Sequence, residues 1–260
     1  MKLHYRIDGP EKGPALVLVN GLFADLNSWD GVMAHLADFR VLRFDGRGQG
    51  QSPKPEGPYR LDCLLADLLR LLDDLAWPVS LFAGLSNGGC LALALAAAHP
   101  ERVSALVAAD CYDRVSPLLR LKIASWLAAH RVGGPTHRFD VATPWIWSES
   151  LLEHQPELVA FYRNKAAAQP DVAVRGLIEG ALGHQIELAR ITCPVLFIAG
   201  EQDLLTPPFS MRAMAERLPH SRFATVRGGH ASLLEYPQTM GDVLVPFFRK
   251  MDRSHLPHVD

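Results

Sequence analysis

The chain has 260 residues, of which 48% are hydrophobic, and its formal net charge at pH 7 is -2. A chain of this length can bury one large core and suits a single domain. The small net charge argues against a protein that binds nucleic acid or an anionic membrane surface. The N-terminal segment MKLHYRIDGP lacks the apolar stretch of a secretory signal, and no segment reaches membrane-spanning length. We therefore expect a cytoplasmic protein.

The spacing of the cysteines indicates whether disulfides or a zinc site should be expected. The four cysteines lie in apolar surroundings without C-x-x-C spacing, at Cys63, Cys90, Cys111 and Cys193. This arrangement favours free thiols in a reducing compartment over disulfides or a zinc site. We expect neither a metal nor a cofactor.

Short apolar runs separated by helical patterns make up most of the chain. Five of these runs are typical of buried parallel strands: ALVLVN (15–20), RVLRFD (40–45), VSLFAG (79–84), VSALVAAD (103–110) and PVLFIAG (194–200). A sixth strand is expected within RFATVRGGHAS (222–232). Between them, YRLDCLLADLLRLLDDL (59–75) has leucines at helical spacing, and GCLALALAAAHPERV (89–103) is an alanine-rich helix that stops near Pro100. The alternation predicts an α/β fold, a mostly parallel sheet with helices on both faces.

Residues 114–190 interrupt this alternation with irregular helical sequence rich in aromatic side chains. The sheet pattern resumes at Ile191, so we expect an α/β core made of residues 1–113 and 191–260, with residues 114–190 as a helical cap over the strand ends. The aromatic residues of the insertion are Trp126, Trp145, Trp147, Phe161 and Tyr162. An alternative is that they pack only against one another and shape no site.

The segment GLSNG (84–88) follows a predicted strand and opens a predicted helix. This is the setting in which a G-x-S-x-G turn lifts a serine hydroxyl clear of a sheet, because the glycines leave room for the tight turn. The turn also directs the backbone N–H of Asn87 toward negative charge that develops at Ser86, beside the positive end of a helix. The alternative is an ordinary strand-to-helix loop.

A nucleophilic serine needs a base, and the base needs a group that orients it. Asp203 follows the strand at 194–200, and His230 lies between glycine and small residues after the next strand. Both therefore belong to the same sheet edge as Ser86. Asp110, at the end of its own strand, is the rival acid, and Glu201 is a weaker one.

With these motifs the chain resembles the α/β-hydrolase superfamily, a resemblance that runs from Leu3 to about Arg249 apart from the insertion. LVNGLFADLNSWD is similar to the oxyanion loop of that family, and RFDGRGQGQS to its D-x-R-G-x-G-x-S turn. The resemblance implies that the backbone N–H of Leu22 is a second oxyanion donor beside that of Asn87. The chain departs from the pattern at Asn20, where many members carry histidine, and we expect its side chain to brace the loop instead. The resemblance also implies that the turn at 45–52 has a structural role.

The serine at position 86 excludes the family's dehalogenases and epoxide hydrolases, which use an aspartate nucleophile. Within the serine branch, the two loops are similar to those of 3-oxoadipate enol-lactonases and small carboxylesterases. We expect a serine hydrolase that cleaves a small acyl ester or lactone through an acyl-enzyme on Ser86, with His230 as base and Asp203 as orienter. The alternatives are acyl transfer of the hydroxyacyl transacylase type, C–C bond hydrolysis, or a ligand-binding receptor of the same fold.

A binding pocket is expected where the insertion meets the strand ends, apolar with a few polar anchors. We expect four residues to contact the substrate: Phe23, Trp145, Trp147 and Leu233. Thr143, His137 and Arg163 are candidates for its polar groups. A carrier-bound substrate would need clustered basic residues, but those of the insertion are spaced like a solvated helix face, at Arg114, Arg120, Lys122 and Arg131. This favours hydrolysis over acyl transfer.

Overall fold

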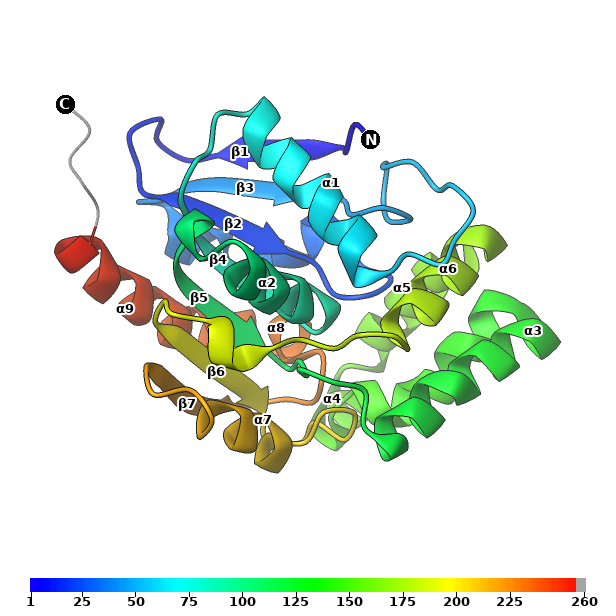
Figure 1. Ribbon diagram of the computed structural model, residues 1–260. Helices are drawn as coiled ribbons and strands as arrows, with labels where there is room; N and C mark the ends of the chain where they lie inside the picture. The colour runs from blue at the N-terminus through cyan, green and yellow to red at the C-terminus, as the bar shows by residue number, and fades with distance from the viewer. Residues whose placement is uncertain (256–260) are drawn as a thin grey trace.

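Seven strands form one sheet at the centre of the computed structural model, which describes residues 1–255 (Figure 1). In spatial order the sheet runs β1-β3-β2-β4-β5-β6-β7. β1 pairs antiparallel to β3, and every other pair is parallel. The strands are β1 Tyr5–Asp8, β2 Ala15–Val19, β3 Arg40–Phe44, β4 Ser80–Leu85, β5 Val103–Ala109, β6 Val195–Gly200 and β7 Ser221–Val226.

Each face of the sheet carries its own apolar core, which explains why the central strands are continuous hydrophobic runs. Along β2, Val17 and Val19 join one cluster while Leu16 and Leu18 join the other. The first cluster includes residues of α1 (Leu61–Asp74), α2 (Asn87–Ala98) and α7 (Pro208–Ala215). The second includes residues of the 3-10 helix η1 (Leu26–Leu36), α8 (Ser232–Glu235) and α9 (Pro237–His255).

The predicted alternation of strands and helices is confirmed, and one strand was missed. All six predicted strands are present, and α1 and α2 lie within the two predicted helical segments or begin close to them. β1 was not predicted because it has only four residues, none of them fully buried, at the edge of the sheet. A strand so short and exposed carries no hydrophobic alternation that a sequence pattern can detect.

Four helices follow β5 and lie together beside the carboxyl ends of the strands (Figure 1). They are α3 Pro117–Ile146, α4 Glu149–His154, α5 Pro156–Ala167 and α6 Asp171–Ala181. Ser116 caps the start of α3 and accepts a hydrogen bond from the Leu119 amide with its side chain, and the helix breaks at Gly134, where φ is 72°. Pro135 follows that break. Two short 3-10 turns, η2 Pro100–Arg102 and η3 Leu188–Arg190, complete the elements.

The two chain connections of this helical group lie side by side. Arg114 forms an isolated β-bridge with Gln185, and the Ile186 amide donates to the Asp113 carbonyl at 2.8 Å. The chain therefore leaves the sheet and returns to it at nearly the same place.

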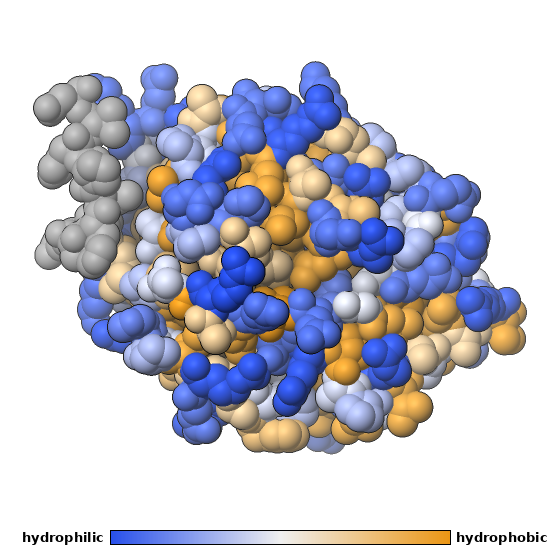
Figure 2. Space-filling view, in the orientation of Figure 1, coloured by the Kyte–Doolittle hydropathy of each residue, from blue (hydrophilic) through white to orange (hydrophobic). Residues whose placement is uncertain are grey.

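The surface is mixed, with hydrophobic side chains interspersed among hydrophilic ones (Figure 2). Hydrophobic surface is visible over α3 in that view, and the exposed large hydrophobic residues of this helix are Leu118, Leu121 and Val132. In the part of the chain that the structure describes, no helix combines the length and the apolar character that crossing a membrane requires.

Candidate active site

Ser86 occupies a strained turn between β4 and α2. Its backbone has φ 54° and ψ -120°, a left-handed conformation that L-residues rarely adopt. The glycines on either side are required by close backbone approach. A Cβ on Gly84 would lie 2.3 Å from the Gly88 carbonyl oxygen, and a Cβ on Gly88 would lie 2.2 Å from that of Val19. The glycines of this segment thus allow the turn that presents the hydroxyl of Ser86.

His230 links Ser86 to Asp203. Its Nε2 lies 2.8 Å from Ser86 Oγ, and its Nδ1 lies 2.9 Å from Asp203 Oδ2. An ionised carboxylate only accepts hydrogen bonds, so Nδ1 carries the proton and Nε2 is left to accept from the serine hydroxyl. The three side chains predicted to act together are therefore within hydrogen-bonding distance, in the order that base catalysis at a serine requires.

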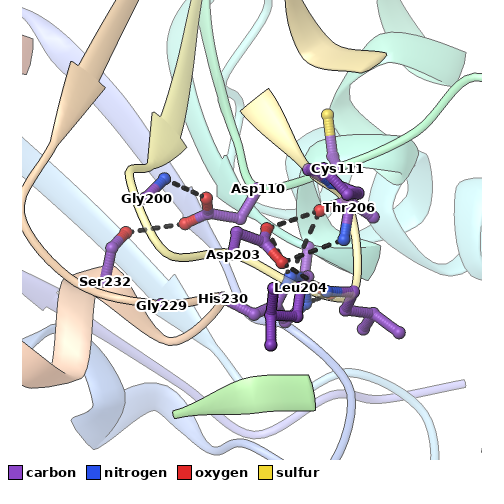
Figure 3. A network of polar contacts seen from close by, with 12 residues as sticks. Asp110, Cys111, Gly200, Asp203, Leu204, Thr206, Gly229, His230 and Ser232 are labelled. Carbon is purple, nitrogen blue, oxygen red and sulfur yellow. Dashed lines mark hydrogen bonds and ion pairs between the residues drawn. The ribbon is translucent and has the colours of Figure 1, made fainter. Parts of the chain in front are cut away.

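The carboxylate of Asp203 is held by its own loop after β6 (Figure 3). The Leu205 and Thr206 amides donate to Oδ1 at 2.8 and 2.9 Å, and the Thr206 hydroxyl donates to Oδ2 at 2.7 Å. Sequence reasoning did not single out Thr206. An aspartate followed three residues later by threonine is typical of a side-chain-capped turn, and that signal could have found it.

Burial and charge act in opposite directions on this group. Burial by itself lowers the pKa of His230, but the charge and hydrogen bond of Asp203, together with the charges of Asp110 and Glu235, outweigh that effect, and the pKa is raised above the ordinary histidine value. Burial likewise opposes ionisation of Asp203, yet the charge of His230 and the hydrogen bonds from His230 and Thr206 bring the pKa of Asp203 below its usual value. The pair thus favours an ionised Asp203 beside an imidazole ready to take a proton.

Asp110, the rival acid, lies next to this group but points elsewhere (Figure 3). Its Oδ1 accepts from the Gly200 amide at 2.7 Å and its Oδ2 from the Ser232 hydroxyl at 2.6 Å. Complete burial, together with the charge of Asp203, raises the pKa of Asp110 well above its ordinary value. Asp110, at the end of β5, therefore holds two segments in place: Gly200, where the loop that carries Asp203 (the acid loop) begins, and Ser232, two residues after His230. Asp203, not Asp110, contacts the imidazole.

The loop after β2 passes directly beside Ser86. A Cβ on Gly21 would lie 3.3 Å from the Cβ of Ser86, so the Leu22 amide that follows is close to the serine. The side chain of Asn20 braces the loop with two hydrogen bonds: its Nδ2 donates to the Phe44 carbonyl at 2.8 Å, and its Oδ1 accepts from Trp29 Nε1 at 3.0 Å. The side chain at position 20 thus makes the bracing contacts expected of it.

The turn at 45–52 supports the same loop with hydrogen bonds. Asp45 Oδ1 accepts from the Leu26 amide and Oδ2 from the Gln51 amide, each at 2.8 Å. The Gln49 side-chain amide donates to the Gly21 carbonyl. These contacts give the turn the structural role expected from its sequence.

Comparison with known proteins shows the family to which the chain belongs. The model of the alpha/beta hydrolase fold family matches residues 14–129. The crystal structure of the enol-lactonase from Burkholderia xenovorans LB400 superposes with a TM-score of 0.88 at 31% identity, over 95% of this chain and 96% of that one. The chain belongs to the alpha/beta hydrolase family. The chain is also similar to 3-oxoadipate enol-lactonase 2 of Acinetobacter baylyi, with 29% identity over 96% of this chain and 94% of that protein. The structure of a thermophilic esterase from Thermogutta terrifontis superposes with a TM-score of 0.87 at 27% identity, over 96% of this chain and 93% of that one.

A cavity of about 130 Å³ opens at Ser86 in this alpha/beta hydrolase. One wall comes from the sheet edge and includes Leu22, Phe23 and His230. The opposite wall comes from α3, the residue that follows it, and α5, and is mainly apolar, with Trp126, Phe139, Trp147 and Tyr162 among its residues. Trp147 packs on Tyr162 with 5.4 Å between ring centroids.

Two of the four predicted substrate contacts do not lie on this cavity. Successive residues of a helix are about 100° apart, so a shift of one or two positions changes the face a side chain presents. Leu233 packs into the core beneath the sheet, and its neighbour Leu234 lines the cavity in its place. Trp145 turns away from the cavity and lies under the Lys122 ammonium, 4.9 Å from the ring centroid. Phe23 and Trp147 do line the cavity.

The polar candidates are corrected in the same way. Of the three, Thr143 lines the cavity, whereas His137 is exposed and Arg163 forms an exposed ion pair with Asp140 at 2.7 Å. Lys122 is not on a solvated face. It is 8% exposed, and its ammonium donates to the Leu204 carbonyl in the acid loop.

Glu235 joins the histidine loop to the end of α3. Its Oε1 accepts from the amides of Gly229 and Ser148 at 3.0 and 3.1 Å, and its Oε2 accepts from the Ser148 hydroxyl. Burial raises the pKa of Glu235, although these hydrogen bonds work against that rise. The Ala231 amide also donates to the Ile146 carbonyl at 3.1 Å. The loop that carries His230 is thus bonded directly to the helical group.

Proposed function

We propose that the protein hydrolyses a small carboxylic ester or lactone by way of an acyl-enzyme on Ser86. The observation that carries the proposal is the pair of contacts at His230, 2.8 Å to Ser86 Oγ and 2.9 Å to Asp203 Oδ2. A serine hydroxyl is a weak nucleophile at neutral pH, and a neutral imidazole acceptor at this distance is the group that activates it.

In the proposed reaction Ser86 Oγ attacks the acyl carbonyl while its proton passes to His230 Nε2. Asp203 stabilises the imidazolium that forms. The developing oxyanion is bound by the backbone N–H groups of Leu22 and Asn87, the second at the positive end of α2. His230 returns the proton to the departing alkoxide or enolate oxygen. It then takes a proton from water, which attacks the acyl-enzyme, and passes that proton to Ser86 Oγ as the acyl–Oγ bond breaks and the acid is released.

We further propose that residues 114–190 act as a cap over the core formed by 1–113 and 191–260. The adjoining connections at Arg114 and Gln185 support a self-contained insertion. The helical wall of the cavity supports a role in substrate selection, because side chains of α3 and α5 face Ser86 across it.

The names of the relatives agree with the choice of bond. Two similar proteins are named enol-lactonases and a third is named an esterase. Acyl transfer to a carrier would use the same triad, but the four basic residues that the sequence offered for binding a carrier do not gather at the cavity: Arg114, Arg120 and Arg131 are exposed and Lys122 is engaged with the acid loop. Water is therefore the acceptor that we favour.

Steady-state kinetics of the wild type and Ser86→Ala on a panel of short acyl esters and lactones test this proposal. We expect Ser86→Ala to lower kcat by at least 1,000-fold, and the Ser86→Ala/His230→Ala double variant to lose little more, because the two side chains act as a unit. Product acid released to water supports hydrolysis. Turnover by Ser86→Ala at the wild-type rate would end the proposal, and tight ligand binding without any product would favour a receptor.

A further inference from the structure

Arg138 is a buried cation on the wall of the cavity, and no carboxylate among the described residues pairs with it. Only 3% of the residue is exposed. Among the described residues, its Nη2 donates a hydrogen bond to the Gln169 side-chain oxygen at 3.3 Å, and its Nε has no partner. The guanidinium lies over the ring of Phe23, 3.9 Å from the centroid. Burial lowers the pKa of Arg138 to about 10, so it remains charged at neutral pH.

A buried charge without a counter-ion is unfavourable, since removing it from water costs several kcal/mol unless other groups replace the lost hydration. The second basic side chain on the cavity wall shows the contrast: Lys165 forms an ion pair with Asp25 at 2.7 Å. No aspartate or glutamate is among the described residues that line the cavity. The wall around Arg138 is therefore positively charged and lacks an anion of its own.

The contacts of Arg138 also reach the loop beside the serine. Gln169, which accepts from Arg138, donates from its Nε2 to the Phe23 carbonyl at 2.9 Å. Phe23 has φ 64°, a left-handed conformation that a bulky residue avoids unless its surroundings hold it there. Leu22, whose amide we propose as an oxyanion donor, directly precedes Phe23.

We propose that Arg138 binds a carboxylate on the substrate, so that the enzyme acts on an ester or lactone that carries a free acid group. The inference rests on the proposed function, because it names the class of molecule that reaches Ser86. An arginine fork with a free Nε suits a planar carboxylate, which can accept two hydrogen bonds from it. The bound anion supplies the missing counter-charge, and the Gln169–Phe23 contacts connect its position to the proposed oxyanion loop.

Two esters of matched length test the inference: monomethyl glutarate, which carries a free acid, and methyl pentanoate, which does not. Acid release is followed in a pH-stat at pH 7.5. We expect the wild type to have the higher kcat/KM for monomethyl glutarate. In Arg138→Met the ratio of the two kcat/KM values falls roughly 10- to 100-fold, as expected for the loss of charged hydrogen bonds. Arg138→Lys, which keeps the charge and loses the fork, gives an intermediate ratio.

The control is Arg163→Met, which removes an exposed arginine of α5 that is paired with Asp140. It leaves the ratio at the wild-type value. Melting temperatures separate binding from a structural role: Arg138→Met melts at or above the wild type, because it removes an uncompensated buried charge. A clear fall in melting temperature with an unchanged ratio would make Arg138 a packing residue and overturn the inference.

A binding measurement gives a readout that does not depend on turnover. Calorimetric titration of Ser86→Ala with glutarate should show binding that weakens at least 10-fold in Ser86→Ala/Arg138→Met and stays unchanged in Ser86→Ala/Arg163→Met. Equal binding by all three proteins would overturn the inference while the proposed hydrolysis stands. Undiminished hydrolysis of both esters by Ser86→Ala would instead overturn the proposed function.

Discussion

The two walls of the cavity are built in different ways. On the sheet side, backbone amides hold the Asp203 carboxylate, and the three reactive side chains lie within hydrogen-bonding distance of one another. On the helical side, several buried polar atoms have no partner within the described residues, at Trp126 Nε1, Arg138 Nε and Trp147 Nε1. The reactive groups of the sheet edge pair with one another, whereas the helical wall has buried polar groups that lack such partners among the described residues. We therefore propose that reaction and selection belong to separate parts of the chain.

The sheet side can be tested by comparing its two aspartates. Asp203→Asn should lower kcat by roughly 1,000- to 10,000-fold, because an amide at this position disturbs the tautomer and the charge balance of His230. Asp110→Asn should lower kcat less than 10-fold, since an asparagine can still pair with the Gly200 amide and the Ser232 hydroxyl. Steady-state kinetics on one ester decide the matter. Equal losses in the two variants would mean that the acid role is shared.

The contact between the walls can be tested at Glu235. Glu235→Ala leaves the Ser148 and Gly229 amides without their acceptor, and we expect the free energy of unfolding to fall by about 3 kcal/mol. Glu235→Gln keeps an oxygen acceptor and should cost about 1 kcal/mol or less. Urea denaturation measures both. The control Glu153→Ala removes a glutamate side chain that is 72% exposed and should change stability very little.

The smallest effect is expected on the helical side, from two tryptophans two residues apart. Trp147→Phe enlarges the cavity and should shift the preference in kcat/KM toward longer acyl chains by roughly 3-fold, which corresponds to the free energy of burying about one methylene group. Trp145→Phe, off the cavity, should leave the chain-length profile as it is. A series of esters from acetyl to octanoyl measures both. A shift in Trp145→Phe alone would place the selective surface elsewhere.

The sequence predicted the sheet side well because its signals are local. Spacing along the chain is enough to locate the serine between two glycines after a buried strand, and the acid and the histidine after later strands. The parallel sheet then brings all three residues to one edge. No comparable local pattern predicts which side chains of the helical wall face the cavity. Whether Trp145 or Trp147 faces the cavity depends on where α3 ends, and Leu233 differs from Leu234 by one position on a short helix.

Arg138 shows the same limit more strongly. In the sequence it is one arginine among many in a helical segment, and nothing nearby in the chain marks it as buried. Its environment arises only when α3 packs against the Phe23 loop and Gln169, which stand 115 residues before it and 31 residues after it. Thr206, by contrast, lies three residues from Asp203, so its role could have been predicted.

Covalent labelling tests most directly the central claim that Ser86 is the nucleophile. The protein is treated with a fluorophosphonate at neutral pH, digested with trypsin and examined by mass spectrometry for the peptide that spans residues 71–102. The account predicts one adduct per chain, on Ser86, with labelling lost in Ser86→Ala and slowed by at least 100-fold in His230→Ala. Labelling of another residue at the same rate, or an unlabelled Ser86 in folded wild-type protein, would contradict it.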